Sequence, residues 1–285
     1  MPEERKKLRG FSLSWQPRGR WNVLDLIEMG RVSVPTYLLC DIDMTWAEEL
    51  RTKLANLGQR VTITAILLKA IAIAQRHHPA SRTALLPWGR VVTFNEIVAG
   101  FTVERNVDCG PAVFLGTIHQ ADSKSIEEIA SELQDYGQKQ IDDVPQLAIE
   151  NRFAGMPWLF RKVILWVGTR IPAMRLRYLS ATFGLSTLGK YGMRAIVPPS
   201  VCTSIFGVGS VDERPVVRNG KIEVRPILSL TYNFDHRLID GAPAARFLDE
   251  IRSLLEGGLS RYLADETGTT GSIGSSGQIG LPAGP

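Results

Sequence analysis

The chain has 285 residues, 44% of them hydrophobic and 22% charged, which is the composition of an ordinary folded protein with a sizeable core. Its formal net charge of +4 is too small to indicate a nucleic-acid partner. The three cysteines lie far apart and lack C-x-x-C spacing. They indicate a reducing compartment, without a disulfide framework and without a zinc site.

Nothing in the sequence directs the chain to a membrane-spanning or secreted class. The N-terminus reads Met-Pro-Glu-Glu-Arg-Lys-Lys with no apolar run behind it, so we expect no signal peptide. The most hydrophobic segment, 64–74, is shorter than the ~20 residues that a membrane-spanning helix needs. The expected location is therefore cytoplasmic.

The N-terminal third alternates helical and extended patterns. Residues 1–20 form a basic arm, and a helix is expected at 21–29. An extended segment follows at 37–43, and Thr45 is a candidate cap for a helix that ends at Gly58. Segment 64–74 is apolar on nearly every face, which predicts a buried helix.

Strand patterns dominate the middle of the chain. Runs of β-branched and aromatic residues predict strands at 91–94, 97–103, 112–115, 182–186 and 202–208. Ser125 and Glu128 have capping-box spacing, so a helix should start behind them. The Asn219-Gly220 pair predicts a hairpin over 216–224, and the tail at 265–285 is rich in glycine, serine and threonine.

A histidine, an aspartate and a glycine follow the next predicted strand. Residues 226–234 predict a half-buried strand, and His236, Asp240 and Gly241 come directly after it. From Pro243 onward an amphipathic helix is expected. His236 therefore lies at a strand-to-helix junction, where rigid elements can hold a side chain over a cleft. By itself, such a histidine could equally be a turn or core residue.

The longer match over 230–248 resembles the catalytic domain of the 2-oxo acid dehydrogenase acyltransferases (dihydrolipoamide acyltransferases), which belong to the chloramphenicol acetyltransferase-like superfamily. Similar landmarks stand at 43–45, 121–125 and 206–210, and the resemblance covers most of 20–257. It implies an α/β fold, a two-layer sandwich with a mixed β-sheet, and a catalytic domain over 21–264. Without the resemblance, the pattern indicates only an α+β protein.

The resemblance implies a CoA-dependent acyltransferase. His236 would be the general base that takes the proton from the attacking thiol, since an imidazole titrates near neutral pH. Ser186 occupies the place of the family's serine, whose hydroxyl faces the oxyanion. From the residues alone, Ser186 is a serine before a turn. Its neighbour is Thr187, where the family usually has asparagine.

Asp240 has two compatible roles in this picture. The family's aspartate pairs with an arginine from the N-terminal segment and fixes the loop that carries the histidine. Arg20 stands where that arginine is expected, with Arg18 as second choice, and Gly241 supports the same loop. The position of Asp240 before Pro243 also indicates a helix N-terminal residue.

The implied partners are other copies of the chain and small molecules. The resemblance implies a homotrimer, or a multiple of trimers, with active sites between subunits. Coenzyme A or its acyl thioester would be a substrate; no permanently bound cofactor, no metal and no covalent acyl-enzyme is implied. We expect no lipoyl domain ahead of the catalytic domain, and Thr36 stands where complex-forming relatives have histidine. Transfer to a hydroxyl or amine, or a non-catalytic scaffold of the same fold, are the alternatives.

An insertion over 151–180 departs from the family pattern. Residues 152–177 hold six basic and no acidic side chains, after eight acidic and two basic ones at 122–150. A basic stretch with tryptophans can contact a membrane surface. It can also cover an acyl pocket, or be buried at a subunit contact. We expect 156–178 to contact either the acyl substrate or an anionic lipid surface.

Overall fold

The computed structural model describes residues 6–8, 11–13, 16–17, 20–107, 110–171 and 181–267. Arg18, Cys109 and most of the tail predicted at 265–285 lie outside these ranges. Among the described residues, no helix is long and apolar enough to span a bilayer.

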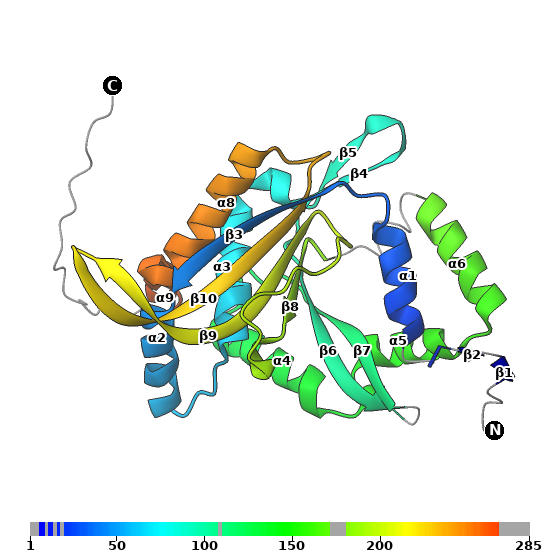
Figure 1. The fold of residues 1–285 in the computed structure, drawn as a ribbon, viewed down its shortest axis with the longest axis horizontal. Helices are drawn as coiled ribbons and strands as arrows, with labels where there is room; N and C mark the ends of the chain where they lie inside the picture. The colour runs from blue at the N-terminus through cyan, green and yellow to red at the C-terminus, as the bar shows by residue number, and fades with distance from the viewer. Residues whose placement is uncertain are drawn as a thin grey trace.

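The described part of the chain is built on a mixed six-stranded sheet in the order β3-β10-β9-β8-β6-β7 (Figure 1). Its strands are β3 (Pro35–Asp43), β6 (Ala99–Val107), β7 (Gly110–Ile118), β8 (Phe183–Thr187), β9 (Ser204–Arg218) and β10 (Lys221–Asp235). Strand β8 runs parallel to β6 and β9, whereas the other neighbours are antiparallel. Two short ladders complete the strands, β1 (Lys6–Leu8) with β2 (Phe11–Leu13) and β4 (Thr83–Leu85) with β5 (Val91–Thr93).

Helices form the second layer of the sandwich. The helices that contribute buried or partly buried side chains to the main core are α2 (Thr45–Asn56), α3 (Ile63–His77), α4 (Ile126–Gln138), α8 (Gly241–Ser253) and α9 (Ser260–Thr267). Near the β7 edge stand α1 (Trp21–Gly30), α5 (Pro145–Gly155) and α6 (Trp158–Arg170) (Figure 1). Short turns of helix are η2 (Pro79–Arg82), η3 (Pro87–Gly89), η4 (Ile141–Asp143), η5 (Gly189–Tyr191) and the π-helical η6 (Leu254–Gly258).

Helix α3 is the centre of the core, as its apolar sequence predicts. Every residue from Ala65 to Gln75 is buried. The two polar ones are satisfied by backbone carbonyls, because a buried donor without a partner is costly. Lys69 Nζ donates to Asp122 O at 3.0 Å and to Lys124 O at 2.5 Å, and Gln75 Nε2 donates to Ser81 O at 3.1 Å.

The opposite face of the sheet is crossed by the chain after η5. Thr231 Oγ1 donates to Ile196 O at 2.5 Å, and Asn233 Nδ2 donates to Pro198 O at 2.9 Å. This close approach requires a residue without a side chain at Gly207, because a Cβ there would lie 2.0 Å from Ile196 O. The backbone of this segment therefore satisfies the polar residues of β10 that point away from the helices.

Most predicted elements are present, with two differences. The strands predicted at 202–208 and 226–234 and the hairpin between them form one continuous hairpin of β9 and β10, which turns at Asn219-Gly220 with positive φ at both residues. Thr45 is not the cap of α2. Thr45 is instead the first residue of the helix and Met44 is its N-cap, while Asp43 Oδ1 accepts from Thr45 N at 3.0 Å and from Thr45 Oγ1 at 2.5 Å. The capping box of Ser125 and Glu128 is confirmed.

Candidate active site

His236 is the first residue after β10. Its backbone N donates to Val34 O at 2.9 Å, which ties the turn to the start of β3. The imidazole is 45% exposed, and its ring centroid lies 5.9 Å from that of Phe234. The backbone of His236 is thus held in place while its ring is open to an incoming group, as a catalytic base requires.

Asp235 fixes this turn from inside. The buried carboxylate accepts from Val34 N at 3.2 Å, from Arg237 N at 3.1 Å and from Arg237 Nη2 at 2.5 Å. Burial alone would raise the pKa of Asp235, but the hydrogen bonds from Arg237 and Val34 outweigh it and lower that pKa. The motif names His236 and Asp240 but passes over Asp235. A carboxylate before a turn, with an arginine two residues later, is the signal that identifies it.

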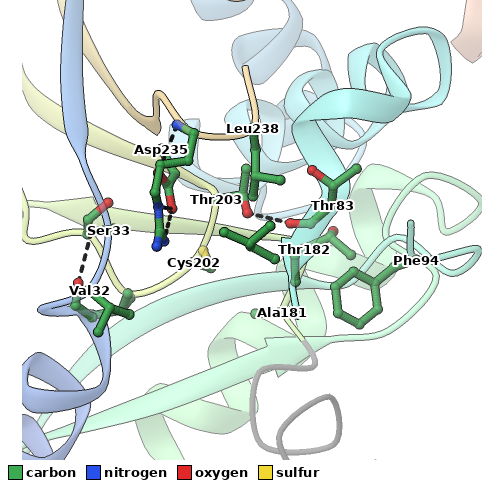
Figure 2. A pocket seen from close by; sticks show the side chains of 16 residues that line it. Val32, Ser33, Thr83, Phe94, Ala181, Thr182, Cys202, Thr203, Asp235 and Leu238 are labelled. Carbon is green, nitrogen blue, oxygen red and sulfur yellow. Dashed lines mark hydrogen bonds and ion pairs between the residues drawn. The ribbon is translucent and has the colours of Figure 1, made fainter. Parts of the chain in front are cut away.

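Behind the turn lies a small cavity of about 50 Å³, shown in Figure 2. Asp235 and Arg237 line one side of it, and Thr203 donates to Thr83 O on another. Cys202 also lines it, and burial raises the pKa of this thiol to about 12. A thiol that stays protonated is a poor nucleophile, so Cys202 is not a catalytic candidate.

Asp240 faces His236 but does not hydrogen bond to it. Its Oδ1 lies 3.8 Å from His236 Nδ1, beyond hydrogen-bond distance, and its side chain is 86% exposed. Its backbone is the N-cap of α8, with Ala244 N donating to Asp240 O at 3.0 Å, while its side chain makes no cap hydrogen bond. The helix-terminal position is confirmed, and the carboxylate is left beside the imidazole.

The expected pair between Arg20 and Asp240 is not formed in this chain. Arg20 lies at the start of α1, whereas the His236 turn meets the chain beyond the other end of that helix, at Val34. Ten helical residues separate the two ends by about 15 Å. Gly241 begins α8, and a Cβ there would meet nothing within 4 Å, so no contact in this chain requires a glycine.

Ser186 lies on β8 in the middle of the sheet. Its neighbours Phe183 and Leu185 point into the helical core, so alternation along the strand directs Ser186 to the opposite face. There it lines a cavity of about 200 Å³, which we call the Ser186 cavity. The walls come from α1, α5, β6, β7, β8 and the segment before β9. Thr187 is exposed and does not line this cavity.

Ser186 and His236 cannot act on one substrate within a single chain. Ser186 pairs with Gly207 of β9, which pairs with Thr231 of β10, five residues before His236. Five residues along a strand and two strand spacings across the sheet separate their Cα atoms by roughly 20 Å. A general base must lie within hydrogen-bond reach of the group that it deprotonates. At this separation, the Ser186 and His236 side chains of one protomer cannot both reach the same reacting atoms.

Glu150 on α5 is the titratable group at the far wall of the Ser186 cavity. Burial raises its pKa to about 7, although hydrogen bonds from Leu115 N and Gln146 act in the opposite direction. Glu150 Oε2 accepts from Leu115 N at 3.0 Å. The sequence pattern did not identify it, because a glutamate on a helix is usually solvated.

The described residues contain no cluster of three histidine, cysteine, aspartate or glutamate side chains placed to hold a metal ion. The groups near the two candidate residues are instead an imidazole, a hydroxyl and carboxylates. Such groups can transfer protons and donate hydrogen bonds to a developing negative charge. These side chains are of the types that group-transfer enzymes use.

Comparison with known proteins identifies the family. Residues 25–144 and 178–262 match the model of the 2-oxoacid dehydrogenases acyltransferase (catalytic domain), so the chain belongs to this family. The match leaves out 145–177, which overlaps the stretch singled out at 151–180. The dihydrolipoyllysine-residue acetyltransferase component of the pyruvate dehydrogenase complex from Staphylococcus epidermidis is 26% identical over 228 residues, 75% of this chain and 43% of the relative. The chain thus spans less than half the length of the curated relatives it matches.

Solved structures agree on the fold. The dihydrolipoamide acetyltransferase of Azotobacter vinelandii has a TM-score of 0.67 and 22% identity, covering 91% of this chain and 99% of that one. A probable dihydrolipoamide acetyltransferase from Listeria monocytogenes has a TM-score of 0.65 and 19% identity, covering 87% and 96%. The expected family and the expected α/β sandwich are both confirmed.

Asp235→Asn should loosen the His236 turn, because it removes the charge that holds Arg237 and Val34. We expect a loss of about 1–3 kcal/mol in the free energy of unfolding near pH 7. A carboxylate with a lowered pKa stabilises the fold above its ordinary pKa and loses this effect as pH falls through its folded pKa. The difference between wild type and variant should therefore shrink below about pH 4.

Urea unfolding at several pH values measures this difference. Asp240→Asn is the matched control, since that side chain is exposed and should change stability little. Equal effects of the two variants would contradict the assignment of Asp235 as the residue that fixes the turn.

Proposed function

We propose that this protein is a CoA-dependent acyltransferase that works as a homotrimer, or a multiple of trimers, with active sites shared between neighbouring subunits. Family membership supports the acyl-transfer chemistry. The observation that carries the shared site is the separation of Ser186 from His236 within one protomer. Each residue then completes a site with its counterpart from a neighbour.

His236 acts as the general base in this proposal. Asp240 lies on the Nδ1 side of the ring, so a proton on Nδ1 faces the carboxylate and leaves Nε2 free to accept one. Nε2 takes the proton from the attacking thiol as sulfur attacks the thioester carbonyl. The same imidazolium then returns the proton to the departing thiolate, so no proton is lost overall.

Ser186 supplies the oxyanion donor. The tetrahedral intermediate carries negative charge on the former carbonyl oxygen, which a hydroxyl donor stabilises more than it stabilises the ground state. The Azotobacter vinelandii structure concerns the roles of a serine, a histidine and an asparagine in catalysis, the last two four residues apart. Ser186 and His236 have the same types, and His236 and Asp240 have the same four-residue spacing, with aspartate in place of asparagine.

The surface around His236 supports contact with another copy. Val32 is 61% exposed, Val34 51% and Leu39 62%, and all three lie on β3 or just before it. Exposed apolar residues along one edge strand are a feature of interaction surfaces. A neighbouring copy that covers them would lie next to the His236 turn, because His236 N donates to Val34 O.

The substrates are proposed by class. The donor or product is coenzyme A or its thioester, and the acceptor is a thiol, hydroxyl or amine. A cytoplasmic location would suit all three. A non-catalytic scaffold is the alternative, and release of free CoA from acyl-CoA with acceptors present discriminates the two, since a scaffold releases none.

His236→Ala should lower turnover by about 10²–10⁴-fold, the usual effect of removing a general base. The fold should persist, because the imidazole is half exposed. Initial rates of CoA release measure the effect, and His119→Ala, an exposed histidine paired with Glu96, is the control. A variant that keeps more than about a tenth of wild-type turnover would disprove the role of His236.

Mixing His236→Ala with Ser186→Ala protein should restore activity that neither has alone. If each site takes one residue from each of two subunits, random exchange of equal amounts leaves about a quarter of the sites intact. Refolding from a mixture followed by CoA-release assays tests this. A mixture of His236→Ala with the double variant should remain inactive. Light scattering that shows a monomer at micromolar concentration would refute the shared site.

A further inference from the structure

The Ser186 cavity has polar groups at two ends and apolar walls between them. Ser186 on β8 is one end, and Gln146 and Glu150 on α5 form the other. Between them the cavity is lined mainly by apolar side chains and glycines, including Leu26, Gly100, Leu115, Gly184, Pro198, Val201 and Ile205. A pocket of this composition binds apolar groups and uses its few polar atoms to select among them.

The length of the cavity follows from the strand register. Leu185 pairs with Phe101, so Ser186 lies level with Thr102, which pairs with Leu115 on β7. Two strand spacings place Leu115 about 10 Å from Ser186, the span of roughly eight carbon–carbon bonds in an extended chain. Glu150 accepts from Leu115 N at 3.0 Å and so marks the far end of that span.

Gln146 is fully engaged in the fold. Its Nε2 donates to Leu115 O at 2.9 Å, and its Oε1 accepts from Thr117 Oγ1 at 2.6 Å and Tyr136 OH at 2.9 Å. Together with Glu150 it covers the free edge of β7, which an unpaired strand otherwise exposes. The carboxyl group of Glu150 accepts from Leu115 N and from Gln146, so it is held at the end of the cavity by the fold itself.

We propose that the Ser186 cavity binds an apolar substrate group that extends about 10 Å from the reacting carbonyl and ends in a hydroxyl or amine that donates to Glu150. This rests on the proposed acyl transfer for its orientation but not for the binding site itself. The raised pKa of Glu150 agrees with it, because a donor from the ligand would replace the water lost on burial. The group is either the acyl chain or the acceptor.

Binding without turnover tests the cavity directly. Octane-1,8-diol should bind to wild type about tenfold more tightly than octan-1-ol, which is the usual worth of one hydrogen bond to a buried acid. Glu150→Gln keeps the acceptor for Leu115 N and should reduce this ratio toward one. Glu127→Gln, on the first turn of α4 and outside the cavity, should leave the ratio unchanged.

A second variant blocks the cavity. A Cβ at Gly184 would lie 3.7 Å from Ile205 Cγ1 and 3.8 Å from Cys202 Sγ, an ordinary contact, so a side chain can start there and the two methyl groups of Gly184→Val would take up further space. It should weaken both alcohols. An unchanged ratio in Glu150→Gln, or unchanged binding in Gly184→Val, would overturn the proposal and leave Glu150 as a residue that only covers the edge of β7.

Turnover measurements then show whether the group bound in the Ser186 cavity belongs to the acyl chain or to the acceptor. The acyl arm compares octanoyl-CoA with 8-hydroxyoctanoyl-CoA at one small thiol acceptor. The acceptor arm compares octane-1-thiol with 8-hydroxyoctane-1-thiol at acetyl-CoA. A kcat/KM ratio that Glu150→Gln changes in one arm alone identifies that substrate. Diol binding without turnover in either arm would refute the acyl transfer while the binding site stands.

A different observation concerns helix α6, which is packed with its charge inward and its apolar residues outward. Arg161 is 2% exposed and pairs with Asp25 of α1, with its guanidinium carbon 5.0 Å from the Trp21 ring. Leu159, Val163 and Trp166 are 63%, 53% and 59% exposed and share one face by their i, i+4, i+7 spacing. Trp158 and Phe160 beside them are 58% and 65% exposed.

We infer that this outer face of α6 binds the interface of an anionic lipid bilayer. A helix that buries a paired arginine while exposing five large apolar side chains is oriented for an apolar partner. The sequence of this stretch also favours anionic lipid, since 152–177 hold six basic and no acidic residues, of which Arg161 and Lys162 pair with Asp25 and Glu28 of α1. Tryptophans suit the headgroup region, where one end of the ring is apolar and the other wet.

Vesicle co-sedimentation tests this with full-length protein. Wild type should bind phosphatidylcholine vesicles that contain phosphatidylserine more strongly than those without, and added salt should weaken the binding. The triple variant Leu159→Ser, Val163→Ser, Trp166→Ser should lose it. The control is Leu57→Ser with Ile222→Ser, residues 77% exposed elsewhere. Binding that the triple variant keeps, or a wild type that binds neither vesicle, would overturn the inference. A smaller oligomer in the triple variant without a lipid effect would assign the face to a second copy instead.

Discussion

Strand β10 is the constraint on which the rest of the structure depends. It is paired along β9 on one side and with all nine residues of β3 on the other, so its register cannot shift without disrupting three strands. One set of alternate residues, from Leu228 to Phe234, packs into the helical core. The other set meets the crossing segment and ends at Asp235. Because the strand is fixed, the turn that carries His236 is fixed as well.

Two carboxyl groups that lose solvent on burial, Asp235 and Glu150, have pKa values shifted in opposite directions. Burial is the largest influence on the pKa of both Asp235 and Glu150. Asp235 gains a guanidinium and two backbone donors, so it remains charged and holds a turn together. Glu150 gains Leu115 N and Gln146, which do not offset burial. The fold does not depend on a charge at Glu150, which suits this carboxyl group to the ligand contact proposed above.

Sequence pattern was most informative where chemistry and local geometry coincide. The alternation before His236, the capping box at Ser125 and the turn at Asn219-Gly220 are local features, and each is present in the structure. The separation of Ser186 from His236 depends on pairing between strands far apart in sequence, which no local pattern contains. The pair expected between Arg20 and Asp240 is not formed within this chain for the same reason, since only the packing of α1 shows which end of that helix meets the turn. The sequence singled out 156–178 as a contact stretch, but which side chains of α6 lie outward depends on the pairing of Arg161 with Asp25 of α1, which no local pattern contains.

The stretch that the family model leaves unmatched, 145–177, contains helices α5 and α6 and none of the strands that position Ser186 and His236. Helix α5 lies along the open edge of β7, and the two side chains that satisfy Leu115 also form the end wall of the Ser186 cavity. A change in α5 would therefore alter the depth and polarity of the cavity while the register that positions Ser186 remained the same. Helix α6 is attached to α1 by Arg161 and Asp25, at a distance from the central strands. In the proposed function, substrate selection and lipid binding would therefore vary in this insertion, because Ser186 and His236 are placed by strands that it does not contact through the core.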